Sequence, residues 1–116
     1  MKTLFILNDS PYGSERAYNG LRLAGALAKT PENQVRVFLM GDGVACAKAG
    51  QKVTEGFFNI QLMVDRVVRS NGEVGVCGSC MDARGIGASE LSAGAKRSSM
   101  DELAQWTQWA DRVLVF

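Results

Sequence analysis

The chain of 116 residues contains no histidine. Histidine is the usual general base near neutral pH and the commonest protein ligand of transition metals. Its absence excludes Ser–His–Asp triads, Cys–His dyads and histidine-based metal centres. Any chemistry must therefore use thiols, carboxylates, amines or a bound cofactor.

The sequence also lacks an excess of one charge and a long apolar run. Its 13 Lys and Arg and 12 Asp and Glu give a net charge of +1, spread without blocks. This leaves no electrostatic footprint for nucleic acid or an anionic membrane. No segment approaches the ~18 apolar residues of a membrane span, and the beginning turns polar too early for a signal peptide. We predict a cytoplasmic protein without nucleic-acid or membrane partners.

The length and the cysteines limit the architecture further. Residues 1–116 are predicted to form a single domain, long enough to bury about two-thirds of the unfolded surface. Cys46, Cys77 and Cys80 are an odd number of cysteines, so we expect reduced thiols and no disulfide framework. One C-x-x-C pair supplies only two of the four ligands of a structural zinc, which makes a metal site the weakest alternative, and none is predicted.

Apolar, β-branched and aromatic runs predict strands. Four such runs cover residues 2–8, 34–40, 73–77 and 112–116, and residues 93–97 are a weak fifth strand. Apolar residues at helical spacing predict helices. These helices cover residues 14–29, capped by Ser14, residues 59–70, ended by Asn71-Gly72, a short segment at 42–49, and a stretch after a Ser99–Glu102 capping box.

The alternation of these elements predicts an α/β fold. Short connections and right-handed crossovers favour a three-layer sandwich with a mainly parallel sheet of about five strands, in flavodoxin-like layering. Ligands of such sheets bind where the loops after the strand carboxyl ends converge. The candidate binding residues in those loops are Asn8, Tyr12, Asp42, Asp82 and Arg84. Turn formation, helix capping and surface ion pairs are the alternative roles for these residues.

The C-G-S-C segment from Cys77 to Cys80 directly follows the third strand. Free backbone N–H groups and the positive end of a following helix lower the pKa of a thiol from about 8.5 toward neutrality. We therefore predict Cys77 and Cys80 as the catalytic thiols, with Arg84 holding a thiolate, persulfide or sulfite-like anion. A half-buried cysteine that only packs is the alternative, and packing is the predicted role of Cys46.

Several ordered segments resemble the DsrE/DsrF-like superfamily of small sulfur-relay proteins, most closely its YchN-like branch. They are N-D-S-P-Y-G-S-E, N-G-L-R-L-A-G-A-L, V-F-L-M-G-D, G-Q-K, E-G-F, N-I-Q, C-G-S-C-M-D-A-R-G-I, E-L-A-Q-W-T and A-D-R-V-L-V-F. The resemblance implies a parallel α/β sandwich assembled as a homotrimer or homohexamer. It also implies a persulfide on Cys77, exchanged with sulfur donor or acceptor proteins. Cys80 departs from the relay members and agrees with the YchN-like branch.

Besides the metal site considered above, three functions follow from these observations. The leading one is a sulfur relay or sulfurtransferase-like protein in which Cys77 accepts sulfane sulfur and Cys80 stabilises or discharges it, without a cofactor. Thiol–disulfide exchange by the same pair is a variant of this function. The main alternative is a non-enzymatic homo-oligomeric binding module for a small anion or nucleotide. A flavin-binding protein is less favoured, because no pair of aromatic residues is placed to sandwich an isoalloxazine.

Overall fold

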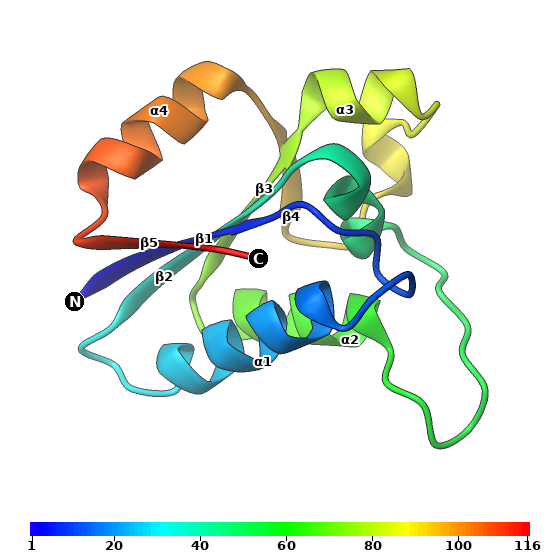
Figure 1. The fold of residues 1–116 in the computed structure, drawn as a ribbon, viewed down its shortest axis with the longest axis horizontal. Coiled ribbons are helices and arrows are strands. Elements are labelled where there is room, and N and C mark those ends of the chain that lie inside the picture. The colour runs from blue at the N-terminus through cyan, green and yellow to red at the C-terminus, as the bar shows by residue number, and fades with distance from the viewer.

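The computed structural model describes residues 1–116, and its centre is one open sheet (Figure 1). Five strands lie in the order β4-β3-β2-β1-β5, and every neighbouring pair is parallel. The strands are β1 (Lys2–Leu7), β2 (Gln34–Leu39), β3 (Glu73–Cys77), β4 (Ala95–Ser98) and β5 (Arg112–Val115). The helices are α1 (Arg16–Ala28), α2 (Ile60–Arg69), α3 (Gly78–Ala83) and α4 (Met100–Trp109), with 3₁₀ turns η1 (Gly41–Ala47) and η2 (Ala88–Glu90).

The helices cover both faces of the sheet, which confirms the predicted three-layer α/β fold. In Figure 1, α1 and α2 lie side by side below the sheet, and α4 lies above it, with the short helix α3 on the same side at the end of β3. Strands β1, β2, β3 and β4 follow one another across the sheet in chain order. Right-handed crossovers between them therefore place α1 and α2 on the same face. The connection from β4 to β5 returns past β1 and carries α4 across the opposite face.

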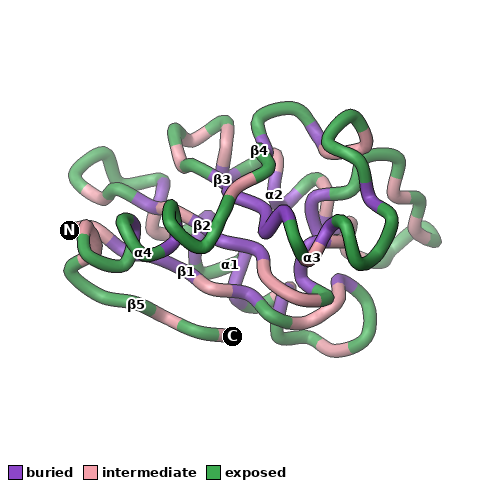
Figure 2. Tube along the Cα trace, turned by 90° about the horizontal axis from the view of Figure 1, so that it is seen from above, coloured by how far each residue is buried: buried purple, intermediate pink, exposed green.

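The core lies around the central strands. Leu4, Phe5 and Leu7 of β1 are fully buried, because a central parallel strand is covered on both faces and reads as a continuous apolar run. Figure 2 shows the contrast with the edge strand β5, which is largely exposed. Val115 of β5 keeps 64% of its surface accessible.

The helix α4 is fixed to the sheet by Trp106. Its indole meets the ring of Phe38 edge-on, with the ring centroids 6.1 Å apart. A Cβ added at Gly75 would lie 3.1 Å from the indole and 3.3 Å from Phe38. The missing side chain at Gly75 therefore makes room for this aromatic contact.

The helix ends differ in part from the predictions. The side chain of Asn59 caps α2 by accepting a hydrogen bond from the N–H of Leu62. The helix stops before Asn71, which adopts a φ of 67°. Ser14 was expected to cap α1, and its hydroxyl accepts from the N–H of Arg16, the first residue of the helix, at 3.3 Å while it donates to Asp9 at 2.7 Å. Ser14 therefore satisfies one free N–H group at the beginning of α1, as a capping serine does.

The helix α4 has half of the predicted capping box. Ser99 accepts from the N–H of Glu102 at 3.2 Å, whereas the Glu102 carboxylate receives the hydroxyl of Ser98. Neither α4 nor any other helix of the structure has the length and apolar character needed to span a bilayer.

Candidate functional site

The thiol pair lies at the carboxyl edge of the sheet. Cys77 is the last residue of β3 and the N-cap residue of α3, and Cys80 lies in the first turn of that short helix. Their Cα atoms are 5.3 Å apart, and the two residues form a disulfide. The expectation of three reduced thiols is therefore wrong for this pair. The tight turn from strand to helix brings residues three positions apart within disulfide range.

One backbone N–H points at each sulfur of the pair. The N–H of Cys80 donates to Sγ of Cys77 at 3.3 Å, and the N–H of Gly41 donates to Sγ of Cys80 at 3.3 Å. Gly41 adopts a φ of 56°, a region that favours glycine, and this turn after β2 directs its N–H toward α3. Hydrogen bonds of this kind stabilise a thiolate when the disulfide opens.

Two of the predicted binding residues, Asp42 and Arg84, lie on the Cys80 side of the pair. Arg84 donates to Oδ1 of Asp42 through Nη2 at 2.8 Å and through Nε at 3.0 Å. Its Nη1 donates to the carbonyl of Cys80 at 3.0 Å. The guanidinium therefore fixes the first turn of α3 to η1. Its ionic partner is Asp42, and it pairs with neither Asp82 nor Glu90.

Asp82 lies on the other side of α3 and pairs with a residue that the sequence analysis missed. Arg97 donates to both carboxylate oxygens of Asp82, at 2.8 and 2.9 Å. This hydrogen-bonded guanidinium lowers the pKa of Asp82 below its usual value. Arg97 pairs with Val76 in the register of β3 and β4, and Ser98 pairs with Cys77. The end of β4 is thus a fourth segment at the carboxyl edge.

Asn8 and Tyr12 do not reach the thiol pair. Nδ2 of Asn8 donates to the carbonyl of Phe116 at 3.3 Å, which joins the ends of β1 and β5. The hydroxyl of Tyr12 contacts Oε1 of Gln51 and accepts from the N–H of Ile60 at 3.3 Å. These hydrogen bonds show that Asn8 and Tyr12 stabilise the loops in which they lie. A shallow hollow of about 300 Å³ beside Tyr12 also contains the exposed ring of Phe57.

Cys46 is free and completely buried in η1. Desolvation by the core raises its pKa to about 12, so it is a neutral thiol at physiological pH. The structure has no group of three or more His, Cys, Asp or Glu that could hold a metal ion.

A cavity of about 370 Å³ opens beside Cys77. It lies between the carboxyl ends of the central strands and the beginning of α4. Its lining consists of Phe38, Cys77, Gly78, Ser79, Arg97, Ser98, Ser99 and Met100. Cys80 is not part of this lining. It is partly exposed, whereas Cys77 is buried apart from this cavity.

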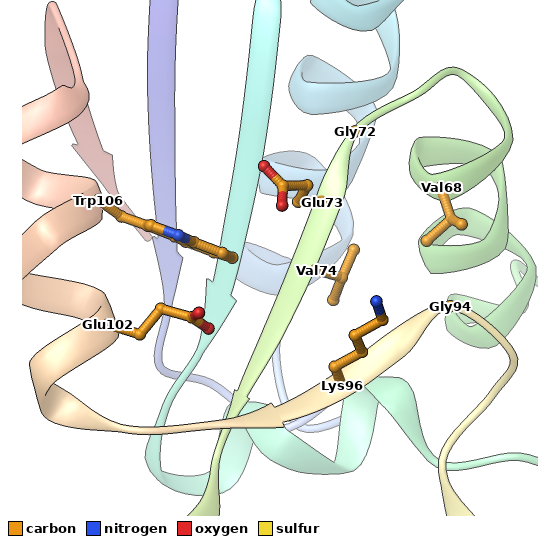
Figure 3. A pocket seen from close by; sticks show the side chains of 8 residues that line it. All are labelled: Val68, Gly72, Glu73, Val74, Gly94, Lys96, Glu102 and Trp106. Atoms are coloured by element: carbon orange, nitrogen blue, oxygen red, sulfur yellow. The ribbon is translucent and has the colours of Figure 1, made fainter.

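A second cavity, of about 360 Å³, lies at the other end of the strands (Figure 3). Gly72 and Gly94, which precede β3 and β4, form part of its wall. Figure 3 shows Glu102 and Trp106 reaching it from α4 and Lys96 from β4. It contains no thiol, whereas Cys77 and Cys80 lie at the opposite edge of the sheet.

This fold and this site define a parallel α/β protein with a C-x-x-C pair directly after a strand. Residues 1–116 match the model of the DsrE/DsrF-like family, and the chain belongs to that family. It is 44% identical over 116 residues to Protein YchN of Escherichia coli K12, covering 99% of this chain and 98% of that one. It is 35% identical to an uncharacterised protein of Methanocaldococcus jannaschii, with 100% of both chains covered.

Solved structures show the same architecture. The crystal structure of the ychN protein from E. coli superposes with a TM-score of 0.94 at 43% identity, covering 100% of this chain and 99% of that one. A protein of unknown function from Bacteroides thetaiotaomicron gives a TM-score of 0.72 at 17% identity, covering 98% and 94% of the two chains. That second likeness concerns the fold alone.

Proposed function

We propose that this protein is a sulfur carrier in which Cys77 receives the sulfur and Cys80 resolves it. The observation that carries the proposal is the cavity at Cys77. Cys77 lines this cavity, and Cys80, which lies outside the lining and is the more exposed of the two residues, is within bonding reach of it. Membership of the DsrE/DsrF-like family, which is related to sulfur-relay proteins, supports the proposal.

Loading begins with the reduced pair. The thiolate of Cys77 attacks the outer sulfur of a donor such as thiosulfate, and a new S–S bond forms on Cys77. The bond between the outer sulfur and the sulfonate breaks, and sulfite leaves with the electron pair. The product is a persulfide on Cys77, next to the N–H of Cys80.

The persulfide is discharged in one of two ways. The thiolate of an acceptor protein attacks the terminal sulfur and regenerates the Cys77 thiolate. Alternatively, the Cys80 thiolate attacks Sγ of Cys77, the pair closes as a disulfide, and hydrosulfide leaves with the electron pair. In this second route the sulfane sulfur gains the two electrons that the thiols lose, and an external thiol must reduce the disulfide before the next cycle.

The intact mass after incubation with thiosulfate tests this proposal. We expect the reduced Cys80→Ser variant to accumulate an adduct of one sulfur atom that reductant removes, because it lacks the resolving thiol. Cys77→Ser should gain no adduct. Cys46→Ser serves as the control and should behave like the wild type. An undiminished adduct on Cys77→Ser would contradict the assignment.

We further propose that the carrier is a homotrimer or homohexamer, as the resemblance implies. The edge strand β5 supports self-association, because it pairs only with β1 and exposes Val113 and Val115. Exposed apolar edge strands are sites of association. Light scattering of the wild type and of Val115→Lys tests this point, with a smaller particle expected for the variant. A monomeric wild type would overturn the proposal.

A further inference from the structure

The cavity beside Cys77 has a lining suited to a small anion. Besides Cys77 and two apolar side chains, its lining includes Ser79, Ser99, Arg97 and Ser98, whose hydroxyl donates to Glu102. No carboxylate is part of the lining. Its volume of about 370 Å³ is at the lower end of the range of small-molecule sites.

Arg97 is held beside Cys77 by two independent contacts. Its Nη1 and Nη2 bind the two oxygens of Asp82, and its Nε–H has no acceptor in the protein. The guanidinium also lies against Gly78, where an added Cβ would be only 2.8 Å from both Cζ and Nε. The residue after Cys77 therefore has to be small for the guanidinium of Arg97 to lie against the beginning of α3. Hydrogen bonding to Asp82 also raises the pKa of Arg97, which keeps the guanidinium charged.

The two sulfurs of the pair have different neighbours. Cys77 faces the cavity with Arg97, whereas Cys80 accepts from the N–H of Gly41 on the far side. The guanidinium on that far side, Arg84, is occupied by Asp42 and the Cys80 carbonyl. The Nε–H is therefore free in Arg97, on the side of Cys77, and bound to Asp42 in Arg84, on the side of Cys80.

We propose that this cavity admits small anionic sulfur nucleophiles and that Arg97 selects them by their negative charge. The nucleophile attacks Sγ of Cys77 and forms a new S–S bond with it. The bond between Cys77 and Cys80 breaks, and the electron pair remains on Sγ of Cys80, where the Gly41 N–H stabilises the thiolate. With a thiol as nucleophile, a second molecule releases the first as a mixed disulfide and completes a two-electron reduction.

This inference rests on the proposed function only in taking Cys77 as the reacting sulfur. Its test uses three thiols with the same two-carbon chain: 2-mercaptoethanesulfonate, 2-mercaptoethanol and cysteamine. The rate of opening of the oxidised pair is measured for each and expressed per concentration of thiolate. For the wild type we expect the sulfonate to react about five to ten times faster than 2-mercaptoethanol. The reason is the attraction between its negative charge and the Arg97 guanidinium, which solvent and salt screen in part. Cysteamine should be the slowest.

A pair of variants isolates Arg97 from its partner. Arg97→Gln alone would leave the carboxylate of Asp82 unpaired and add a repulsion of its own. The comparison is therefore between Asp82→Asn and Asp82→Asn/Arg97→Gln, which differ only in the guanidinium. The preference for the sulfonate should persist in the first and disappear in the second. Equal preferences in the two Asp82 variants, or no preference in the wild type, would overturn the inference.

The experiments distinguish failure of the sulfur-carrier proposal from failure of the anion-selective cavity. Selectivity for the sulfonate without a persulfide on Cys77 would support the anion-selective cavity and contradict the sulfur carrier. A persulfide on Cys77 with equal rates for the three thiols would support the carrier and contradict the role of Arg97.

Discussion

The backbone N–H of Gly41 donates a hydrogen bond to Sγ of Cys80 across 3.3 Å. This bond joins the turn after β2 to the first turn of α3, so two segments far apart in the sequence form one site. A glycine is favoured at position 41, because a φ of 56° costs other residues roughly 1 kcal/mol or more.

Replacing Gly41 with alanine should therefore affect both stability and the thiol. We expect the free energy of unfolding in urea to fall by about 1 kcal/mol. We also expect slower alkylation of the reduced Cys80 near neutral pH, because a displaced N–H stabilises the thiolate less well.

Gly50→Ala is the matched control, since Gly50 has a φ of 81° and open space around its Cα. It should lose a similar free energy and leave the alkylation rate of Cys80 unchanged. Equal alkylation rates in the two alanine variants would contradict a role for the Gly41 N–H.

Replacing Gly78 with alanine should displace Arg97 without changing any charge. The added Cβ would meet the guanidinium at 2.8 Å, and a flexible side chain can move away more readily than backbone. We expect the preference for 2-mercaptoethanesulfonate to fall toward that of the Asp82→Asn/Arg97→Gln variant. Gly87→Ala, at a position with contacts of 3.6 Å or more, should keep the wild-type preference.

The buried Cys46 predicts a dependence of stability on alkaline pH. Burial raises its pKa from 9.0 in the reference state to about 12 in the folded protein. Its contribution to stability is therefore fully present below pH 9 and is lost as the pH rises toward 12. Between these values the wild type should lose up to about 1.4 kcal/mol per pH unit more than Cys46→Ala. Parallel urea midpoints of the two proteins across this range would contradict the burial of the thiol.

The contact of Trp106 with Phe38 predicts a large difference between the two tryptophans. Trp106 is only 7% exposed and fills the space above Gly75. We expect Trp106→Ala to lose about 3–5 kcal/mol of unfolding free energy. Trp109 is partly exposed and stacks on Arg36, whose Cζ lies 4.0 Å from the ring centroid. Trp109→Ala should lose clearly less, and equal losses would contradict the packing of α4.

The sequence predicted the central strands well because burial leaves a strong apolar pattern. The bounds of β3, at Glu73–Cys77, agree with the prediction, and β1 and β2 end one residue earlier than expected. The edge strand β4 leaves a weaker pattern, whereas the edge strand β5 was predicted to within one residue. Residues 93–97 were predicted for β4, which in fact runs from Ala95 to Ser98 with charged Lys96 and Arg97 in its middle.

That shift of β4 explains why Arg97 was missed. Its side chain reaches the site only because Ser98 pairs with Cys77 in the sheet, and the sequence contains no local sign of this register. Asn8 and Tyr12, in contrast, were predicted as binding residues and do not reach the thiol pair. Their loop follows a strand at the correct edge, yet its hydrogen bonds direct them to the end of β5 and to the beginning of α2.

The site of sulfur addition tests the central claim most directly. The reduced wild type is incubated briefly with thiosulfate and blocked by alkylation, and the tryptic peptide that contains both Cys77 and Cys80 is fragmented. We predict the additional sulfur on Cys77, with Cys80 and Cys46 free of it. Additional sulfur on Cys80 in place of Cys77 would contradict the assignment of Cys77 as the receiving thiol.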